Sequence, residues 1–136
     1  MDFVDFHTHP YRLDDLAPGT REFVLDVSPA IREHGDRLSD PVFVAELLRS
    51  RGVRHAVVLP EHCPRTSGNV RTETVLEICA AAPDVLLPFA SVDPNSDDEP
   101  ADLLRRYLDA GARGLKLYPS YQYYYLNDPG AYALYD

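Results

Sequence analysis

The sequence has few cysteines, and their spacing excludes the common cysteine-rich scaffolds. Cys63 and Cys79 are the only two cysteines among 136 residues. Two cysteines are too few for a disulfide framework, and their separation fits neither a zinc finger nor a CxxC motif. We therefore expect two reduced thiols in a cytoplasmic protein.

The sequence also lacks an excess of positive charge and a long apolar run. Its net charge is −9, whereas proteins that bind nucleic acid or anionic membranes carry basic surfaces. We therefore expect neither nucleic acid nor a membrane as a partner. No apolar run approaches the roughly 20 residues of a membrane-spanning helix. Residues 1–10, MDFVDFHTHP, also lack the basic and apolar regions of a secretory signal.

Four short apolar segments alternate with amphipathic segments along the chain. The apolar segments predict strands at 3–9, 53–60, 85–92 and 112–119, and the amphipathic segments predict helices at 40–52, 69–83 and 97–111. The first of these helices has the clearest limits, with Asp40 as N-cap, Pro41 at its first position and Gly52 at its end. This alternation predicts an α/β fold with a parallel sheet and right-handed crossovers.

The two ends of this βα series add further expectations. Residues 11–39 form a long insertion after the first strand, where α/β enzymes place lids and substrate loops. Residues 127–136, NDPGAYALYD, have the features of a helix start. A complete (β/α)8 TIM barrel needs about 250 residues. We therefore expect residues 1–136 to be the N-terminal half of such a barrel, about four βα units, truncated within its fourth helix.

The first strand carries two histidines separated by one residue, in the stretch FVDFHTHP at 3–10. Because strand side chains alternate between faces, Asp5, His7 and His9 share one face, with the two histidine Cα atoms about 7 Å apart. Both imidazoles could then reach one ion at zinc–nitrogen distances of about 2.0–2.1 Å. The alternative is two ordinary polar residues at a strand end, since short motifs give false positives. The position at the carboxyl end of the strand, where barrel active sites lie, favours the metal site.

The fourth strand carries a lysine on the face opposite two leucines. In GLKLYP at 114–119, Leu115 and Leu117 suit contact with helices, whereas Lys116 faces inward. Burial lowers the pKa of a lysine. Lys116 could therefore become a carbamate that binds a metal, or remain an ammonium that pairs with a substrate carboxylate or with Asp5. The alternative is a lysine with a buried stem and a solvated amine.

Further polar residues follow the second, third and fourth strands. Tyr118 and Tyr121 begin a tyrosine-rich stretch that could line a substrate pocket or pack at the barrel rim. Asp93 could orient a neighbouring group, although capping of a loop is commoner. The stretch LPEHCPRTSGN at 59–69 is expected to be a solvated loop, with a second metal site as the alternative interpretation. The polar residues of that stretch are Glu61, His62, Cys63 and Arg65.

Taken together, VDFHTHP at the start and GARGLKLYPSYQYYYLNDPGAYALYD at the end resemble the amidohydrolase-related family of metal-dependent hydrolases. The resemblance implies a (β/α)8 barrel in which His7 and His9 bind a divalent metal, commonly zinc. It also makes Lys116 a candidate carbamylated ligand, as in members with two metals. The implied reaction is attack of a metal-activated water on a C–N or C–O bond of a small organic substrate. The family's remaining ligands, on strands five, six and eight, have no counterpart here, so this segment alone is expected to be inactive.

Three other functions stay open at this point. Related decarboxylases use the same metal to hold a carboxylate substrate. Metallophosphoesterases of the polymerase-and-histidinol-phosphatase type also begin with His-x-His, but they require more metal-spaced His and Asp residues and phosphate-binding basic groups. The third is a non-catalytic half-barrel, whose exposed strand edges would form homo-oligomers or pair with a missing C-terminal half.

Overall fold

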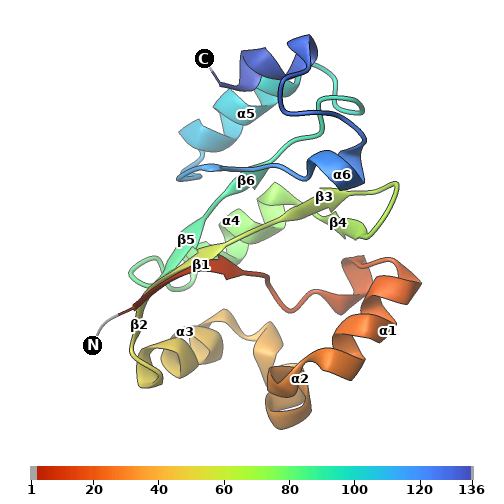
Figure 1. The fold of residues 1–136 in the computed structure, drawn as a ribbon. Helices are drawn as coiled ribbons and strands as arrows, with labels where there is room; N and C mark the ends of the chain where they lie inside the picture. Colours follow the sequence, from red (N-terminus) through yellow and green to blue (C-terminus); the bar gives the residue numbers. More distant parts are fainter. Residues whose placement is uncertain (1–2, 136) are drawn as a thin grey trace.

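The chain forms two groups of parallel strands, with helices along them (Figure 1). The computed structural model describes residues 3–135. The first three parallel strands are neighbours in the order β1 (Phe3–Thr8), β2 (Val53–Val58) and β5 (Leu86–Pro88). A second parallel pair consists of β6 (Ala90–Ser91) and β7 (Leu115–Lys116).

The predicted third strand, which the structure divides into β5 and β6, connects the two groups of strands. Only Phe89 separates β5 from β6, and its N–H donates to the carbonyl of Val58 at 3.0 Å. On the other side, the Arg113 N–H donates to the carbonyl of Pro88 at 2.7 Å. The four predicted strands therefore lie side by side in sequence order, which is the arrangement of half a (β/α)8 barrel, and the predicted fold class is confirmed.

Three helices connect the successive strands, and their limits follow the sequence signals. They are α3 (Pro41–Ser50), α4 (Thr72–Ala80) and α5 (Pro100–Asp109). The Asp40 side chain accepts a hydrogen bond from the Val42 N–H at 2.9 Å, as expected of an N-cap. Gly52, which follows α3, has a φ of 81°, a conformation that favours glycine. No helix within residues 3–135 is long and apolar enough to cross a membrane.

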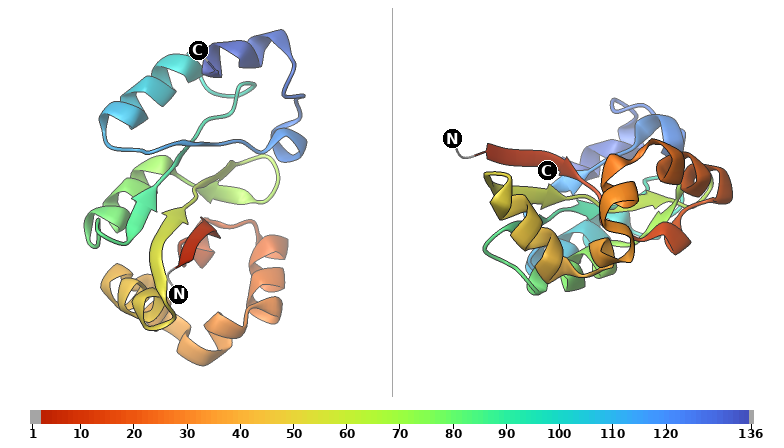
Figure 2. Two further views of the ribbon diagram at one scale, coloured as in Figure 1. Left: turned by 60° about the vertical axis from the view of Figure 1, so that its left-hand side comes forward. Right: turned by 90° about the horizontal axis from the view of Figure 1, so that it is seen from below.

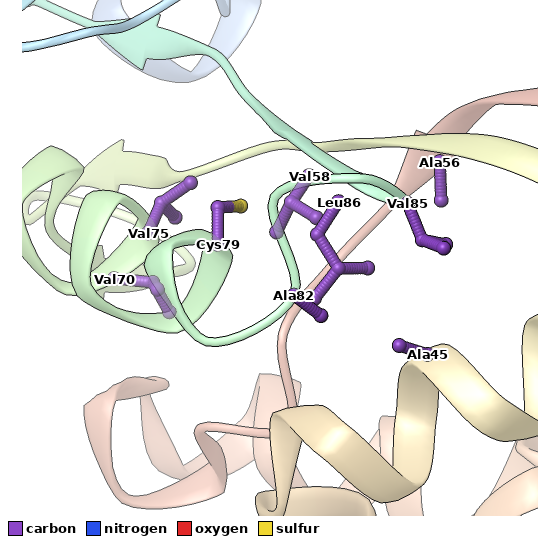
Figure 3. Close-up of a cluster of buried hydrophobic side chains, with 9 residues drawn as sticks. All are labelled: Ala45, Ala56, Val58, Val70, Val75, Cys79, Ala82, Val85 and Leu86. Carbon is purple, nitrogen blue, oxygen red and sulfur yellow. The ribbon is translucent and has the colours of Figure 1, made fainter.

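Apolar side chains between sheet and helices form two clusters. The first joins β2 and β5 to α3 and α4 and is drawn in Figure 3. The second joins β6 and β7 to α5, and Leu115 and Leu117 pack against it. The prediction that Leu115 and Leu117 of the fourth strand contact the helices is therefore correct.

Two segments differ from the sequence prediction. Residues 59–69 are not a solvated loop, because β3 (Glu61–Cys63) and β4 (Gly68–Val70) form an antiparallel hairpin in which Cys63 and Val70 are buried. The helix expected at 127–136 is a 3-10 helix, η3 (Pro129–Leu134), preceded by the short helix α6 (Pro119–Gln122). Residue 136 lies outside the described residues.

The insertion after β1 forms four short helical segments at one end of the molecule (Figure 2). They are η1 (Leu13–Asp15), α1 (Pro18–Val27), α2 (Pro29–His34) and η2 (Gly35–Ser39). The hairpin holds the start of this insertion through a β-bridge between Leu16 and Gly68 and a hydrogen bond from the Ala17 N–H to the Ser67 carbonyl at 2.9 Å.

Gly68→Ala is expected to destabilise the protein by about 2–4 kcal/mol. Gly68 has a φ of 149°, and an added Cβ would lie 2.7 Å from both the Asp15 carbonyl oxygen and the Leu16 Cα. Backbone atoms must therefore move apart. Urea unfolding would measure the loss, with Gly19→Ala as the control, because nothing lies within 4 Å of a Cβ added there. Equal stability of the two variants would contradict this prediction.

Candidate functional site

The imidazoles of His7 and His9 converge at the carboxyl end of β1. Their Nε2 atoms lie 3.1 Å apart, and their rings meet edge to face with centroids 5.1 Å apart. At zinc–nitrogen distances of about 2.0–2.1 Å, this separation corresponds to an N–Zn–N angle of about 100°, near the tetrahedral value. The geometry therefore fits two ligands of a common ion.

The backbone reaches this arrangement by a route that simple alternation does not predict. Asp5 lies opposite Ala56 and Thr8 lies opposite Val58, so three steps along β1 match two steps along β2. The His7 N–H donates to the Asp5 carboxylate at 2.9 Å. Such an irregularity changes the direction of side chains and is common beside active sites.

The environment of His9 favours its neutral form, which is the form that binds a metal. His9 remains partly exposed to solvent, but the protein around its ring partly desolvates it and so lowers its pKa; Glu61 opposes this effect, while His7 and Lys116 add to it. Within residues 3–135, no cluster of three or more His, Cys, Asp and Glu residues could hold a metal ion. His7 and His9 thus fit a metal as a pair of ligands, and their metal-binding role stays a prediction.

Lys116 lies on β7, opposite Ser91 of β6. Its Nζ lies 4.7 Å from the ring centroid of Tyr118, a distance at which the ring attracts an ammonium ion. The Tyr118 hydroxyl donates to the Pro60 carbonyl at 2.8 Å, and its ring stacks on that of Tyr121 at 6.1 Å. Burial raises the pKa of Tyr118 above its usual range, so its hydroxyl stays protonated. The structure therefore groups the three residues, while their catalytic and substrate-binding roles stay predictions.

His62 lies between Asn69 of the facing hairpin strand and Asp97 of the loop that follows β6. Its Nδ1 lies 2.8 Å from Asn69 Oδ1, and its Nε2 lies 2.9 Å from Asp97 Oδ1. The hydrogen bond to Asp97 raises the pKa of His62, and this effect outweighs burial. Because both ring nitrogens have partners, His62 links the hairpin to the loop that follows β6. Burial also raises the pKa of the neighbouring Cys63 thiol to about 12, so neither residue is suited to a second metal site.

The pair of His62 and Asp97 predicts a specific pH dependence of stability. Burial acts to raise the pKa of Asp97, but hydrogen bonds from His62 and from the Asp93 N–H outweigh it and lower that pKa. The raised pKa of His62 contributes stability below about pH 6.5, which is lost as the pH rises through the folded-state pKa. The lowered pKa of Asp97 contributes stability above about pH 4, which is lost as the pH falls through its folded-state pKa.

Asp97→Asn should therefore cost more stability at about pH 6 than at about pH 9. It should also lower the pKa of His62, because burial then acts with less opposition. Urea unfolding at the two pH values and NMR titration of the imidazole would measure both effects. Asp98→Asn is the matched control, since Asp98 is an exposed neighbour. An unchanged His62 pKa in Asp97→Asn would contradict the assignment.

Two buried polar residues, Gln122 and Asp93, form hydrogen bonds with neighbouring segments of this site. Gln122 is fully buried, and its side-chain amide donates to the carbonyls of His62 and Val92, each at 3.0 Å. Asp93 is buried and accepts from the Asn95 N–H at 2.9 Å and from the Arg65 guanidinium at 3.3 Å. The expected capping role of Asp93 is correct. Gln122 was not predicted, because no local sequence feature distinguishes it from a surface glutamine.

Comparisons with known proteins agree with this architecture. The amidohydrolase family model matches residues 4–136. An uncharacterized TIM-barrel protein from Bordetella bronchiseptica is 21% identical, with a TM-score of 0.74 over 99% of this chain and 50% of its own. A probable 2-pyrone-4,6-dicarboxylic acid hydrolase from Acinetobacter baumannii, solved with citric acid bound, is 18% identical, with a TM-score of 0.59 over 98% of this chain and 44% of its own. The chain thus spans about half the length of these structures, and no curated protein matches it.

Proposed function

Because this chain belongs to the amidohydrolase family, we propose that it supplies the first metal ligands, His7 and His9, of a metal-dependent hydrolase. The proposed substrate is a small organic molecule with a C–N or C–O bond to be cleaved. The observation that carries the proposal is the 3.1 Å separation of the two Nε2 atoms at the carboxyl end of a barrel strand. A divalent ion such as zinc, when bound there, supplies an activated water and polarises the scissile carbonyl.

The chain's own residues would hold and orient the reactants. His7 and His9 present two nitrogens from one strand end, and partial desolvation of the His9 ring favours its neutral form. We infer that the remaining ligands come from further barrel strands. Exposed apolar residues on β1 support this inference, since Phe3, Val4 and Phe6 are at least half exposed. Further strands beside β1 would cover them. The free thiols of Cys63 and Cys79 fit a cytoplasmic location.

We further propose that Lys116 acts as an ammonium that pairs with a carboxylate of the substrate. The ring of Tyr118 near its Nζ favours the charged amine over a neutral amine ready to react with carbon dioxide. Lys116→Arg should then retain most activity, whereas Lys116→Met should raise KM by about 10–100-fold with a smaller change in kcat. A carbamate carbon signal in NMR spectra of the intact protein with labelled bicarbonate would contradict this role if the signal is absent from Lys116→Arg.

The hydrolase proposal is tested with the intact protein and a panel of small carboxylated amides, esters and lactones. Hydrolysis should disappear after treatment with a zinc chelator and return when zinc is added. Carbon dioxide release without hydrolysis would favour the decarboxylase alternative. Phosphate release from phosphomonoesters would favour the metallophosphoesterase alternative, against which the family assignment argues. Absence of all three activities in metal-loaded intact protein would favour a non-catalytic barrel.

A further inference from the structure

A cavity of about 480 Å³ lies between the insertion and the helix-covered side of the sheet. Val58 and Leu86 line it from the sheet and also belong to the core cluster in Figure 3. Val44 and Leu47 line it from α3. The cavity therefore extends from the hydrophobic core, and apolar side chains predominate on this side, with Glu61 as a charged exception.

The insertion supplies the opposite wall without having a core of its own. Leu16, Val24, Ile31 and Leu38 line the cavity, yet none of the four helical segments of the insertion contains a buried residue. Apolar side chains that face an unfilled space lack partner atoms on that side and forfeit their dispersion contacts. The insertion is thus folded around a space that its own side chains do not fill.

We propose that this cavity binds an uncharged, largely apolar small molecule of about 10–20 non-hydrogen atoms, which completes the core of the insertion. The cavity volume falls within the range of about 300–1,000 Å³ that small-molecule sites occupy. Arg12, Ser28, Ser39 and Glu61 also line the cavity, and water can bind beside them. Water is a poor occupant of the apolar remainder, because each buried water molecule needs about two to four polar partners. The site does not depend on the proposed hydrolase activity. It nevertheless involves the same strand end, since Thr8 and His9 also line the cavity.

The first test uses N-phenyl-1-naphthylamine, an uncharged probe whose fluorescence rises in apolar surroundings, with the intact protein. Binding should saturate at one probe per chain. Val24→Trp fills the cavity and should weaken binding by about tenfold or more, a difference of about 1.4 kcal/mol. Phe23→Trp is the matched control, because Phe23 is the adjacent residue on α1 and its side chain is 64% exposed. Its affinity should stay within about twofold of the unchanged protein.

A second measurement needs no variant and so does not depend on the folding of Val24→Trp. Saturating probe should slow hydrogen exchange of the amides of α1 and α2 by about tenfold or more and leave those of β7 unchanged. Three results would overturn the proposal: no saturable binding, equal affinity of the two tryptophan variants, or exchange in α1 and α2 that the probe does not alter.

Discussion

Replacing both His7 and His9 by alanine is expected to abolish metal binding by the intact protein. The two Nε2 atoms, 3.1 Å apart, are the only convergent pair of imidazole nitrogens among residues 3–135. Loss of groups that merely orient a ligand costs about 10–100-fold in metal affinity. Removing two ligands should therefore cost about a thousandfold or more, and zinc content should fall below about a tenth of an equivalent.

Elemental analysis of the purified intact protein would measure this change, alongside the two single variants. His34→Ala is the matched control, because His34 packs edge to face on Phe43 at 5.6 Å and lies within the insertion, away from the pair. It should retain the metal. Circular dichroism would show that the double variant is folded, as expected for two exposed residues. Unchanged zinc content in the folded double variant would remove the basis of the hydrolase proposal.

The order of the parallel strands could be predicted because each strand is a short apolar run with its own start and stop signals. Asp40 and Gly52 mark the limits of α3 without reference to any other part of the chain. The hairpin at 61–70 could not be predicted in the same way. Its strands have three residues each, too few for a periodic pattern. Contacts with distant residues stabilise the hairpin, since His62 pairs with Asp97, 35 positions away.

The candidate site shows the same division between local and distant information. The spacing of His7 and His9 placed both residues at one strand end. The irregular pairing between β1 and β2 depends on Ala56 and Val58 of the partner strand, which the spacing alone does not reveal. The role of Lys116 also depends on where the Tyr118 ring lies. Chemistry carried by one strand is therefore predictable from sequence, whereas chemistry shared between loops is not.

Gln122→Leu is expected to lower the free energy of unfolding by about 3–5 kcal/mol. In the fully buried Gln122, the side-chain Nε2 donates to the carbonyls of His62 and Val92, and its Oε1 accepts from the Tyr118 N–H at 3.0 Å. These three partners come from β3 of the hairpin and from the segments that follow β6 and β7. Leucine would leave them without hydrogen bonds, and each unsatisfied buried group costs about 1–3 kcal/mol.

Two further variants separate hydrogen bonding from packing. Gln122→Glu keeps the volume of the side chain but directs a carboxylate at two carbonyl oxygens, so it should destabilise the protein at least as much as Gln122→Leu at neutral pH. Ser120→Ala, at an exposed position of the same helix, should change stability by less than about 0.5 kcal/mol. Urea unfolding of the intact protein would measure all three. If Gln122→Leu costs less than about 1 kcal/mol, the three segments are not held together through this amide, and the positions of His62 and Tyr118 must depend on other contacts.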